Sequence, residues 1–206
     1  MQKQHEFVEE KKALRKKIRL VLKSFWSSCS DKERLRLGEV LADKIKTLQV
    51  WHDVQNICIF LSMPDEIDTT ALALDALTNS KKVFVPRIRG DDIEFVQITM
   101  GWQDWSRDGW NIPEPPDHLS SIPPEMFIKT PTLIVVPGLA FDLSGYRLGR
   151  GKGFYDRYLA TLDNAAKKLC MSMPCLLGVG IYLQIVESVP AEPHDIKMDI
   201  LVTVDV

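Results

Sequence analysis

The sequence predicts an α/β fold: a single domain over residues 1–206, with a mostly parallel sheet flanked by helices on both faces, as in a Rossmann-like three-layer sandwich. Short runs of consecutive apolar residues recur along the chain and alternate with segments of helical periodicity. Strands that are apolar at every position are typical of parallel sheets covered on both faces. A length of 206 residues allows one domain with a substantial core or two small ones, and no internal repeat divides the chain.

Two helices are expected at the start of the chain. Residues 7–25 place apolar side chains at helical spacing, and Lys11 and Arg15 lie four residues apart, on one face of that helix. Ser30 followed by Glu33 is a capping box that begins a second helix. The apolar positions of this second helix are Leu35, Leu37, Val40, Leu41, Ile45 and Leu48.

The remaining elements alternate between strands and helices, as a parallel sheet requires. Strands are expected at 57–61, 83–85, 133–136, 176–181 and 200–204, with an additional one at 93–98, and further helices at 70–77 and 154–169. Ligands of such sheets bind beyond the carboxyl ends of the strands, so the loops after Leu61, Val85 and Val136 are candidate site loops.

Between Gly101 and Pro131 the chain loses periodicity and gains five prolines and three tryptophans. Tryptophans carry a large apolar area that needs a surface to pack on, so an ordered loop is expected rather than disorder. Composition leaves two roles open for Trp110: it lines a site for a planar ligand, or the rings only anchor the loop to the core.

Composition restricts the partners and the compartment. A net charge of −2 gives no global reason to expect nucleic acid or an anionic membrane as partner. Four cysteines without a CxxC pair indicate free thiols in a reducing compartment. No run is long and apolar enough to span a membrane, and the first residues lack the apolar core of a signal peptide. A cytoplasmic monomer is expected, with a mitochondrial pool left open.

The strand at 133–136 leads into the sequence PGLAFDLSGYRLGRGKGFYD at 137–156. Glycines free the backbone to present N–H groups, and a helix that begins near Phe154 adds its positive dipole end. These features suit a polyphosphate, although a glycine-rich surface turn is the alternative. The three alternate glycines Gly149, Gly151 and Gly153 are interleaved with the cations Arg147, Arg150 and Lys152.

Two known phosphate loops are excluded by register. A Walker A loop needs a hydroxyl residue where this chain has Gly153, and its first glycine would fall on Tyr146. The dinucleotide-binding pattern needs a third glycine where this chain has Asp156. The loop therefore belongs to another type.

The loop, taken with the rest of the chain, resembles the signature of 5-formyltetrahydrofolate cyclo-ligases, also called methenyltetrahydrofolate synthetases. Pro137-Gly138 and Phe141-Asp142 precede RLGRGKGFYD at 147–156, and the resemblance covers nearly the entire chain in the right order. Its other parts are Lys11-Lys12 with Leu14-Arg15, FLSM at 60–63 with EIDT at 66–69, Pro86-Arg87, WNIPEP at 110–115 and HDIKMD at 194–199.

The resemblance implies a ligase that uses ATP and Mg²⁺ to convert 5-formyltetrahydrofolate into 5,10-methenyltetrahydrofolate, with release of ADP and phosphate. In this scheme the formyl oxygen attacks the γ-phosphate to give an N5-iminium phosphate. N10 then attacks the activated carbon, and phosphate leaves.

The resemblance also implies roles for particular residues. Lys152 and Arg150 are the expected catalytic residues, because phosphoryl transfer relies on positioning and charge stabilisation. Asp156 and Asp195 are the expected Mg²⁺ ligands, since Mg²⁺ prefers hard carboxylate oxygens. The expected ATP contacts are Lys11, Arg15, Arg147, Leu148, Gly149, Arg150, Gly151, Lys152, Gly153, Phe154 and Tyr155. The expected folate contacts are Met63, Asp68, Trp110, Arg150, Gly151, Lys152, Gly153, Phe154 and Tyr155, among which thioether and aromatic groups favour a flat heterocycle.

Without the resemblance, plainer interpretations hold for several of these residues. Lys11 and Arg15 would form a solvated helix face, and Asp156 would be a first-turn acid that stabilises its helix. Met63, directly after a strand, would be a core residue, and Asp195 would go unnoticed in a polar turn.

Two positions depart from many relatives. Phe154 stands where a tyrosine is common, so one hydroxyl is lost and the ring is expected to pack. Asp68 is glutamate in some relatives, which shifts a substrate contact by one methylene. Neither change touches the phosphate or metal groups, so activity is expected to survive.

Three other functions compete with the cyclo-ligase. A small-molecule kinase lacks an obvious catalytic base beside the loop. A nucleic-acid-binding relative is disfavoured by the negative net charge and the absence of basic tails. A relative that sequesters folate without turnover is disfavoured by the presence of Lys152 and Asp156.

Overall fold

The computed structural model describes residues 2–192 and 195–206, and its centre is a seven-stranded sheet with the strand order β10-β8-β5-β1-β2-β3-β4. The five strands from β10 to β2 are parallel, and β3 and β4 add to β2 as antiparallel strands. The predicted mostly parallel sheet is thus confirmed. The seven strands are β1 (Asn56–Cys58), β2 (Lys82–Arg89), β3 (Asp92–Ile98), β4 (Ser121–Ile122), β5 (Thr132–Val136), β8 (Cys175–Ile181) and β10 (Ile200–Val204).

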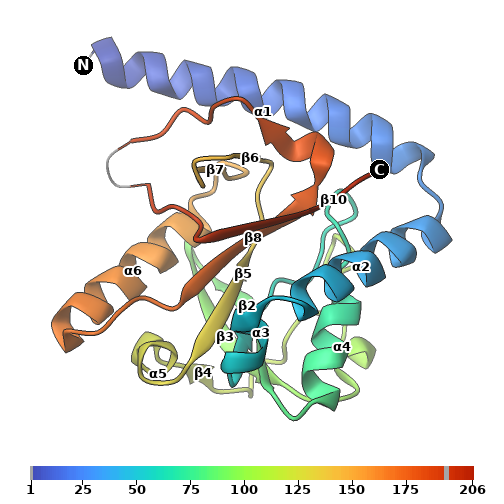
Figure 1. Cartoon of the computed structure of the whole chain (residues 1–206), viewed down its shortest axis with the longest axis vertical. Helices are drawn as coiled ribbons and strands as arrows, with labels where there is room; N and C mark the ends of the chain where they lie inside the picture. Colours follow the sequence, from blue (N-terminus) through green and yellow to red (C-terminus); the bar gives the residue numbers. More distant parts are fainter. Residues whose placement is uncertain (1, 193–194) are drawn as a thin grey trace.

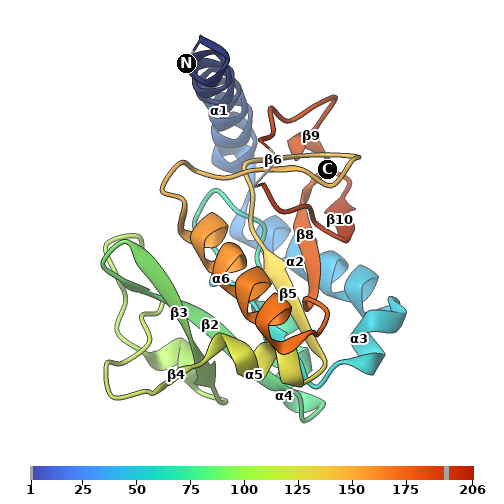
Figure 2. The same ribbon diagram turned by 90° about the vertical axis from the view of Figure 1, so that its left-hand side faces the viewer.

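Helices cover both faces of this sheet, as predicted (Figure 2). The sheet divides the core into two clusters, one on each face. On one face α1 (Gln2–Ser28), α2 (Asp31–Lys46), α3 (Gln49–Asp53) and α4 (Thr70–Thr78) contribute buried Leu22, Leu37, Trp51 and Leu72. On the other face α5 (Pro124–Lys129) and α6 (Phe154–Leu169) contribute Phe127 and Leu162. Strand residues such as Ile57 and Cys58 alternate between the two clusters, which explains why β1 is apolar at successive positions.

Helix α2 begins where the capping box predicts. The Ser30 hydroxyl accepts a hydrogen bond from the Glu33 backbone N–H at 3.2 Å, while the Glu33 carboxylate pairs with Arg36. Ser30 therefore caps the helix, and the side chain of Glu33 serves a different contact.

The predictions for 57–61, 83–85 and 101–131 need correction. β1 ends at Cys58, although the buried residues continue to Phe60. β2 does not stop before Pro86-Arg87 but runs to Arg89, because it turns through Gly90 into a hairpin with β3. The segment 101–131 is not a plain loop: it holds β4, α5 and the short helix η1 (Trp102–Asp104).

A second, three-stranded sheet lies above the main one, in the order β7-β6-β9 (Figure 1). Its strands are β6 (Ala140–Asp142), β7 (Arg147–Leu148) and β9 (Ile185–Val186), and η2 (Tyr182–Gln184) leads from β8 into it. Helix α1 runs across this end of the molecule, which is the end where β5 and β8 terminate. Of the loops predicted to form a site, the segment after Val136 reaches α1 through the carbonyl of Gly149, and the segment after Leu61 reaches Arg150 through Asp65. The loop predicted after Val85 is wrong, because β2 continues to Arg89 before it turns into β3.

Buried polar side chains hold the three-stranded sheet and its connections in place through hydrogen bonds to the backbone. The Asp142 carboxylate accepts hydrogen bonds from the backbone N–H groups of Ser144, Tyr146 and Val189 at 2.9–3.0 Å. The Gln184 amide donates to the carbonyl of Gly138 and accepts from the N–H of Ile181. Within the described residues, the helices are all too short or too polar to cross a membrane.

Candidate functional site

The glycine loop, residues 149–153, connects β7 to α6. Gly151 (φ 104°) and Gly153 (φ 72°) adopt left-handed backbone conformations that side-chain-bearing residues rarely enter. Gly153 is the N-cap of α6, which begins at Phe154 as predicted. The positive end of α6 therefore points at the loop, as phosphate binding requires.

Helix α1 places two arginines against this loop. Arg15 Nε donates to the carbonyl of Gly149 at 2.9 Å, and Arg19 Nη2 donates to the carbonyl of Arg150 at 2.9 Å. A guanidinium bound to a carbonyl keeps its formal charge, so both arginines add positive potential beside the loop. The interpretation of Arg15 as part of a solvated helix face is wrong.

Lys11 lies one turn earlier on α1 and binds elsewhere. Its ammonium donates to Asp195 Oδ2 at 2.9 Å and to Glu192 Oε2 at 3.3 Å. The structure thus brings Lys11 to Asp195 across 184 residues of sequence and joins α1 to the turn before β10. Lys11 is a partner of carboxylates here rather than an open cation.

A pocket opens beside the loop, at the end of β1. Its empty volume is about 500 Å³, with open solvent at the mouth included. Three of the predicted folate contacts, Met63, Asp68 and Trp110, line it. The other lining residues are Arg34, Ser62, Pro64, Glu66 and Asn111.

The tryptophans of 101–131 divide between the two roles that composition leaves open. Trp102 is buried and Trp105 packs against the core, so these two rings anchor the segment. Trp110 is 63% exposed and lines the pocket, where its face is available to a ligand.

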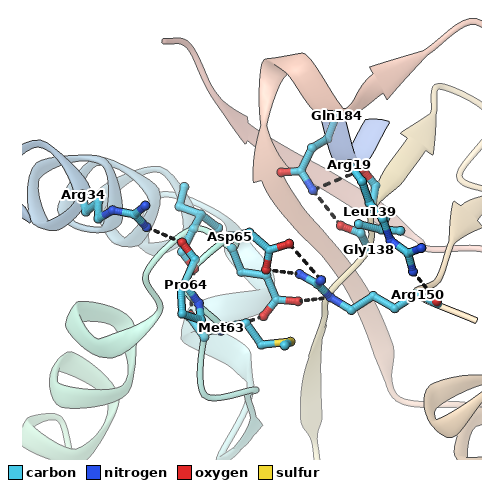
Figure 3. Close-up of polar contacts among 12 residues, drawn as sticks. Arg19, Arg34, Met63, Pro64, Asp65, Gly138, Leu139, Arg150 and Gln184 are labelled. Atoms are coloured by element: carbon cyan, nitrogen blue, oxygen red, sulfur yellow. Dashed lines mark hydrogen bonds and ion pairs between the residues drawn. The ribbon is translucent and has the colours of Figure 1, made fainter. Parts of the chain in front are cut away.

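Arg150 connects the pocket to the glycine loop (Figure 3). Its Nη1 and Nη2 donate to the Asp65 carboxylate at 2.9 and 2.6 Å, and its Nε donates to Glu66 Oε1 at 3.0 Å. Glu66 Oε2 in turn accepts a hydrogen bond from the Met63 backbone N–H at 3.0 Å. Burial raises the pKa of the Glu66 carboxyl against the opposing influence of Arg150.

Lys152 lies on the exposed side of the loop. Its carbonyl accepts a hydrogen bond from Arg157 Nη1 at 3.0 Å, while its ammonium has no ion-pair partner among the described residues. Of the two residues predicted to be catalytic, Lys152 is therefore the cation that remains available to a phosphate.

Phe154 and Tyr155 point into the protein at the start of α6. Phe154 packs against the core beneath Arg157, whose guanidinium lies 5.6 Å from the ring centroid, so the predicted packing of this ring is found. The hydroxyl of Tyr155 is buried without a hydrogen-bond partner in the described structure, and burial raises its pKa. Tyr155 therefore supports the loop from below as a neutral phenol.

The two carboxylates predicted to bind Mg²⁺ each contact a cation of the site. Asp156 is paired with Arg147, and Asp195 with Lys11. Over residues 2–192 and 195–206, no group of three or more acidic, histidine or cysteine side chains is arranged around a metal position. Mg²⁺ prefers carboxylate oxygens and completes its shell with water and phosphate oxygens, so the side chains of Asp156 and Asp195 have the donor chemistry that this ion takes.

Several residues of the site were not predicted from the sequence: Arg19, Arg34, Asp65 and Glu66. Asp65 and Glu66 follow β1 at the carboxyl edge of the sheet, a position that could have indicated them. Arg19 continues the i, i+4 series of Lys11 and Arg15 and could have been found from that spacing. Arg34 carries no comparable signal. His194, the first residue of the HDIKMD run at 194–199, lies outside the described residues.

Comparison with known protein families extends over nearly the whole chain. Residues 8–204 match the model of the 5-formyltetrahydrofolate cyclo-ligase family. The 5-formyltetrahydrofolate cyclo-ligase of Mus musculus is 32% identical over 192 residues, covering 88% of this chain and 89% of the mouse protein.

Two solved structures share the fold. The NMR structure of Aquifex aeolicus 5,10-methenyltetrahydrofolate synthetase superposes with a TM-score of 0.70 at 29% identity, covering 92% of this chain and 89% of that one. The 5,10-methenyltetrahydrofolate synthetase from Mycoplasma pneumoniae superposes with a TM-score of 0.66 at 22% identity, covering 93% and 96%, a likeness of fold alone.

Proposed function

Because the chain belongs to the 5-formyltetrahydrofolate cyclo-ligase family, we propose that it converts 5-formyltetrahydrofolate into 5,10-methenyltetrahydrofolate at the expense of ATP. The formyl oxygen would attack the γ-phosphorus and displace ADP, which leaves an N5-iminium phosphate. N10 would then attack the activated carbon, lose its proton and expel inorganic phosphate. The products are ADP, phosphate and the cyclised folate.

The observation that carries this proposal is the junction between the pocket and the glycine loop. Arg150 of the loop is hydrogen-bonded to Asp65 and Glu66, which belong to the turn that lines the pocket. A phosphate held at the loop and a planar molecule held at Met63 and Trp110 would therefore be neighbours. Transfer of a phosphoryl group between two substrates requires such adjacency.

Each part of the site has a role in this reaction. The N–H groups of the glycine loop and the N-terminus of α6 would bind the ATP phosphates. Lys152, with its ammonium unpaired among the described residues, would neutralise the charge on the γ-phosphoryl group during transfer. Arg15 and Arg19 would add positive potential while they hold the loop carbonyls.

The folate would enter the pocket with its pterin against Met63 and Trp110. A thioether and an indole face favour a flat heterocycle, and the Asp68 carboxylate can accept hydrogen bonds from pterin N–H groups. One chain supplies all of these groups, so a monomer would suffice.

Asp156 and Asp195 would hold Mg²⁺ through their carboxylates, with release or sharing of their present partners Arg147 and Lys11. When bound, the ion would neutralise charge on the ATP phosphates. Arg147, whose side chain is 6% exposed, would keep Asp156 oriented toward the loop.

The test is the near-ultraviolet absorbance of the protein mixed with 5-formyltetrahydrofolate, ATP and Mg²⁺. We expect the methenyltetrahydrofolate band to grow, and to be absent when ATP or Mg²⁺ is omitted. Folded protein that binds folate but forms no band would instead be a sequestering relative. Folded protein that neither binds folate nor forms the band would contradict the proposal and return attention to a kinase or an RNA-binding protein.

A further inference from the structure

Arg150 is held by two carboxylates and is not a free cation. Asp65 takes both Nη groups and Glu66 takes Nε, at distances of 2.6–3.0 Å. With all three groups ionised, the cluster carries a net charge of −1 (one guanidinium and two carboxylates). An ATP phosphate that approached Arg150 would meet these carboxylates as well, so Arg150 adds little net positive charge to the site.

The turn at 63–66 is fixed on both sides. Glu66, whose side chain is 9% exposed, binds Arg150 with Oε1 and the Met63 backbone N–H with Oε2. On the opposite side, Arg34 of α2 donates to the carbonyl of Pro64 (Figure 3). The single carboxylate of Glu66 thus sets the position of Met63, in the pocket, relative to Arg150, in the glycine loop.

We propose that Asp65 and Glu66 are positioning residues that act through Arg150. They fix the distance between the folate pocket and the glycine loop, so that the formyl oxygen is placed for in-line attack on the γ-phosphorus of ATP. This inference rests on the proposed function and assigns Arg150 to alignment of the two substrates, leaving the phosphoryl charge to Lys152. Misplacement by about 1 Å costs such a reaction roughly 100-fold, so a small loosening is measurable.

The test is a double-mutant cycle on kcat with Glu66→Gln, Arg150→Ala and the combined variant. We expect Glu66→Gln to lower kcat by about 10- to 100-fold, because alignment is lost. The KM for ATP should change less than about threefold, because the loop amides, Lys152 and Arg15 still bind the nucleotide. In the Arg150→Ala background, Glu66→Gln should cause little further loss, since the two residues act as one unit.

Two further variants control for the loss of a carboxylate as such and for a failure of Glu66→Gln to fold. Glu33→Gln removes a carboxylate from a different Arg–Glu pair, on the exposed face of α2, and should leave kcat at the wild-type value. If Glu66→Gln does not fold, Asp65→Asn takes its place in the cycle, because Asp65 is 37% exposed and tolerates the change better.

Three outcomes would overturn the inference. A rise in kcat for Glu66→Gln would mean that the carboxylates mask a catalytic Arg150. A raised KM for ATP at unchanged kcat would make Arg150 a nucleotide contact, and additive losses in the double variant would mean that Glu66 acts independently of Arg150. Wild-type protein without turnover would instead contradict the proposed function itself, which separates the two failures.

Discussion

At the scale of single residues, Lys152 is the group on which turnover should depend most. Its ammonium is exposed at the glycine loop and, within the described structure, has no carboxylate partner. We predict that Lys152→Ala lowers kcat by about 100-fold or more, the usual loss when one donor to a developing anion is removed. The measurement is kcat at saturating substrates, with the melting temperature as a check on folding.

A matched control for this variant is Lys168→Ala, which removes another exposed lysine, at the far end of α6. Its kcat should equal that of the wild type. A wild-type kcat in Lys152→Ala would rule out the assignment of Lys152 to the phosphoryl group.

The carboxylate of Asp156 has two possible roles that a metal titration separates. It is paired with Arg147 and lies in the first turn of α6. We predict that Asp156→Asn raises the Mg²⁺ concentration needed for half-maximal activity by about 10-fold, since one of few protein ligands is lost. Asp163→Asn, on the same helix and paired with Lys167, serves as the control. An unchanged Mg²⁺ titration would mean that Asp156 only orients Arg147 and stabilises the helix.

At the scale of elements, the start of α6 depends on a glycine for its shape. Gly153 has a φ of 72°, and a Cβ there would lie 2.7 Å from Arg157 Nη1. We predict that Gly153→Ala destabilises the protein by about 1–2 kcal/mol, the cost of a left-handed non-glycine residue, and lowers the melting temperature by about 2–8 °C.

The control for the loop is Gly109→Ala, because a Cβ at Gly109 meets no atom within 4 Å and its φ is not in the left-handed region. Its melting temperature should stay within about 1 °C of the wild type, as expected of a surface change. Equal melting temperatures for both variants would show that the loop rearranges without cost.

The elements that the sequence predicts well are those with a local signal. β5 is buried throughout and apolar from Leu133 to Val136, α2 begins at its cap, and α6 begins directly after the glycines. The continuation of β2 through Pro86 and Arg87 has no such signal, since its cause is pairing with β3. The Arg87 guanidinium is buried there and donates hydrogen bonds to the Glu94 carboxylate and to two carbonyls of the segment 116–119. A local sequence pattern does not reveal these contacts, because they depend on how the chain folds.

In the candidate site too, features with a local sequence signal are predictable and long-range contacts are not. The glycine loop and the α1 cations have recognisable spacing, and in the structure Arg15 donates to the carbonyl of Gly149 in this loop. The link from Arg150 to Asp65 and Glu66 joins residues about 85 positions apart, so only the folded chain reveals it. Acidic residues in a polar turn look like ordinary solvated surface until their partner is known.

At the scale of the whole molecule, long-range ion pairs join segments that the sheet alone leaves separate. Lys11 reaches Asp195 over 184 positions, and Arg150 reaches Asp65 over 85. The first pair connects α1 to the turn before β10. The second connects the turn at 63–66 to the glycine loop (Figure 3). The candidate site is therefore assembled from most of the chain, which fits a family resemblance that extends over residues 8–204.

The buried carboxyl of Glu66 makes global stability depend on pH in a direction that can be tested. Burial raises its pKa in the folded protein above the ordinary 4.5, so its contribution to stability is complete below the unfolded pKa and is lost as pH rises through the folded pKa. We therefore predict that the free energy of unfolding of the wild type, minus that of Glu66→Gln, falls as pH rises from 4.5 upward, measured by urea unfolding at a series of pH values. The Glu33→Gln difference should instead rise with pH, and it should do so below 4.5, because Arg36 lowers the pKa of that carboxyl. A Glu66 difference that grows with pH would mean that attraction to Arg150 outweighs burial, and that the cluster is held as a net stabilising ion pair.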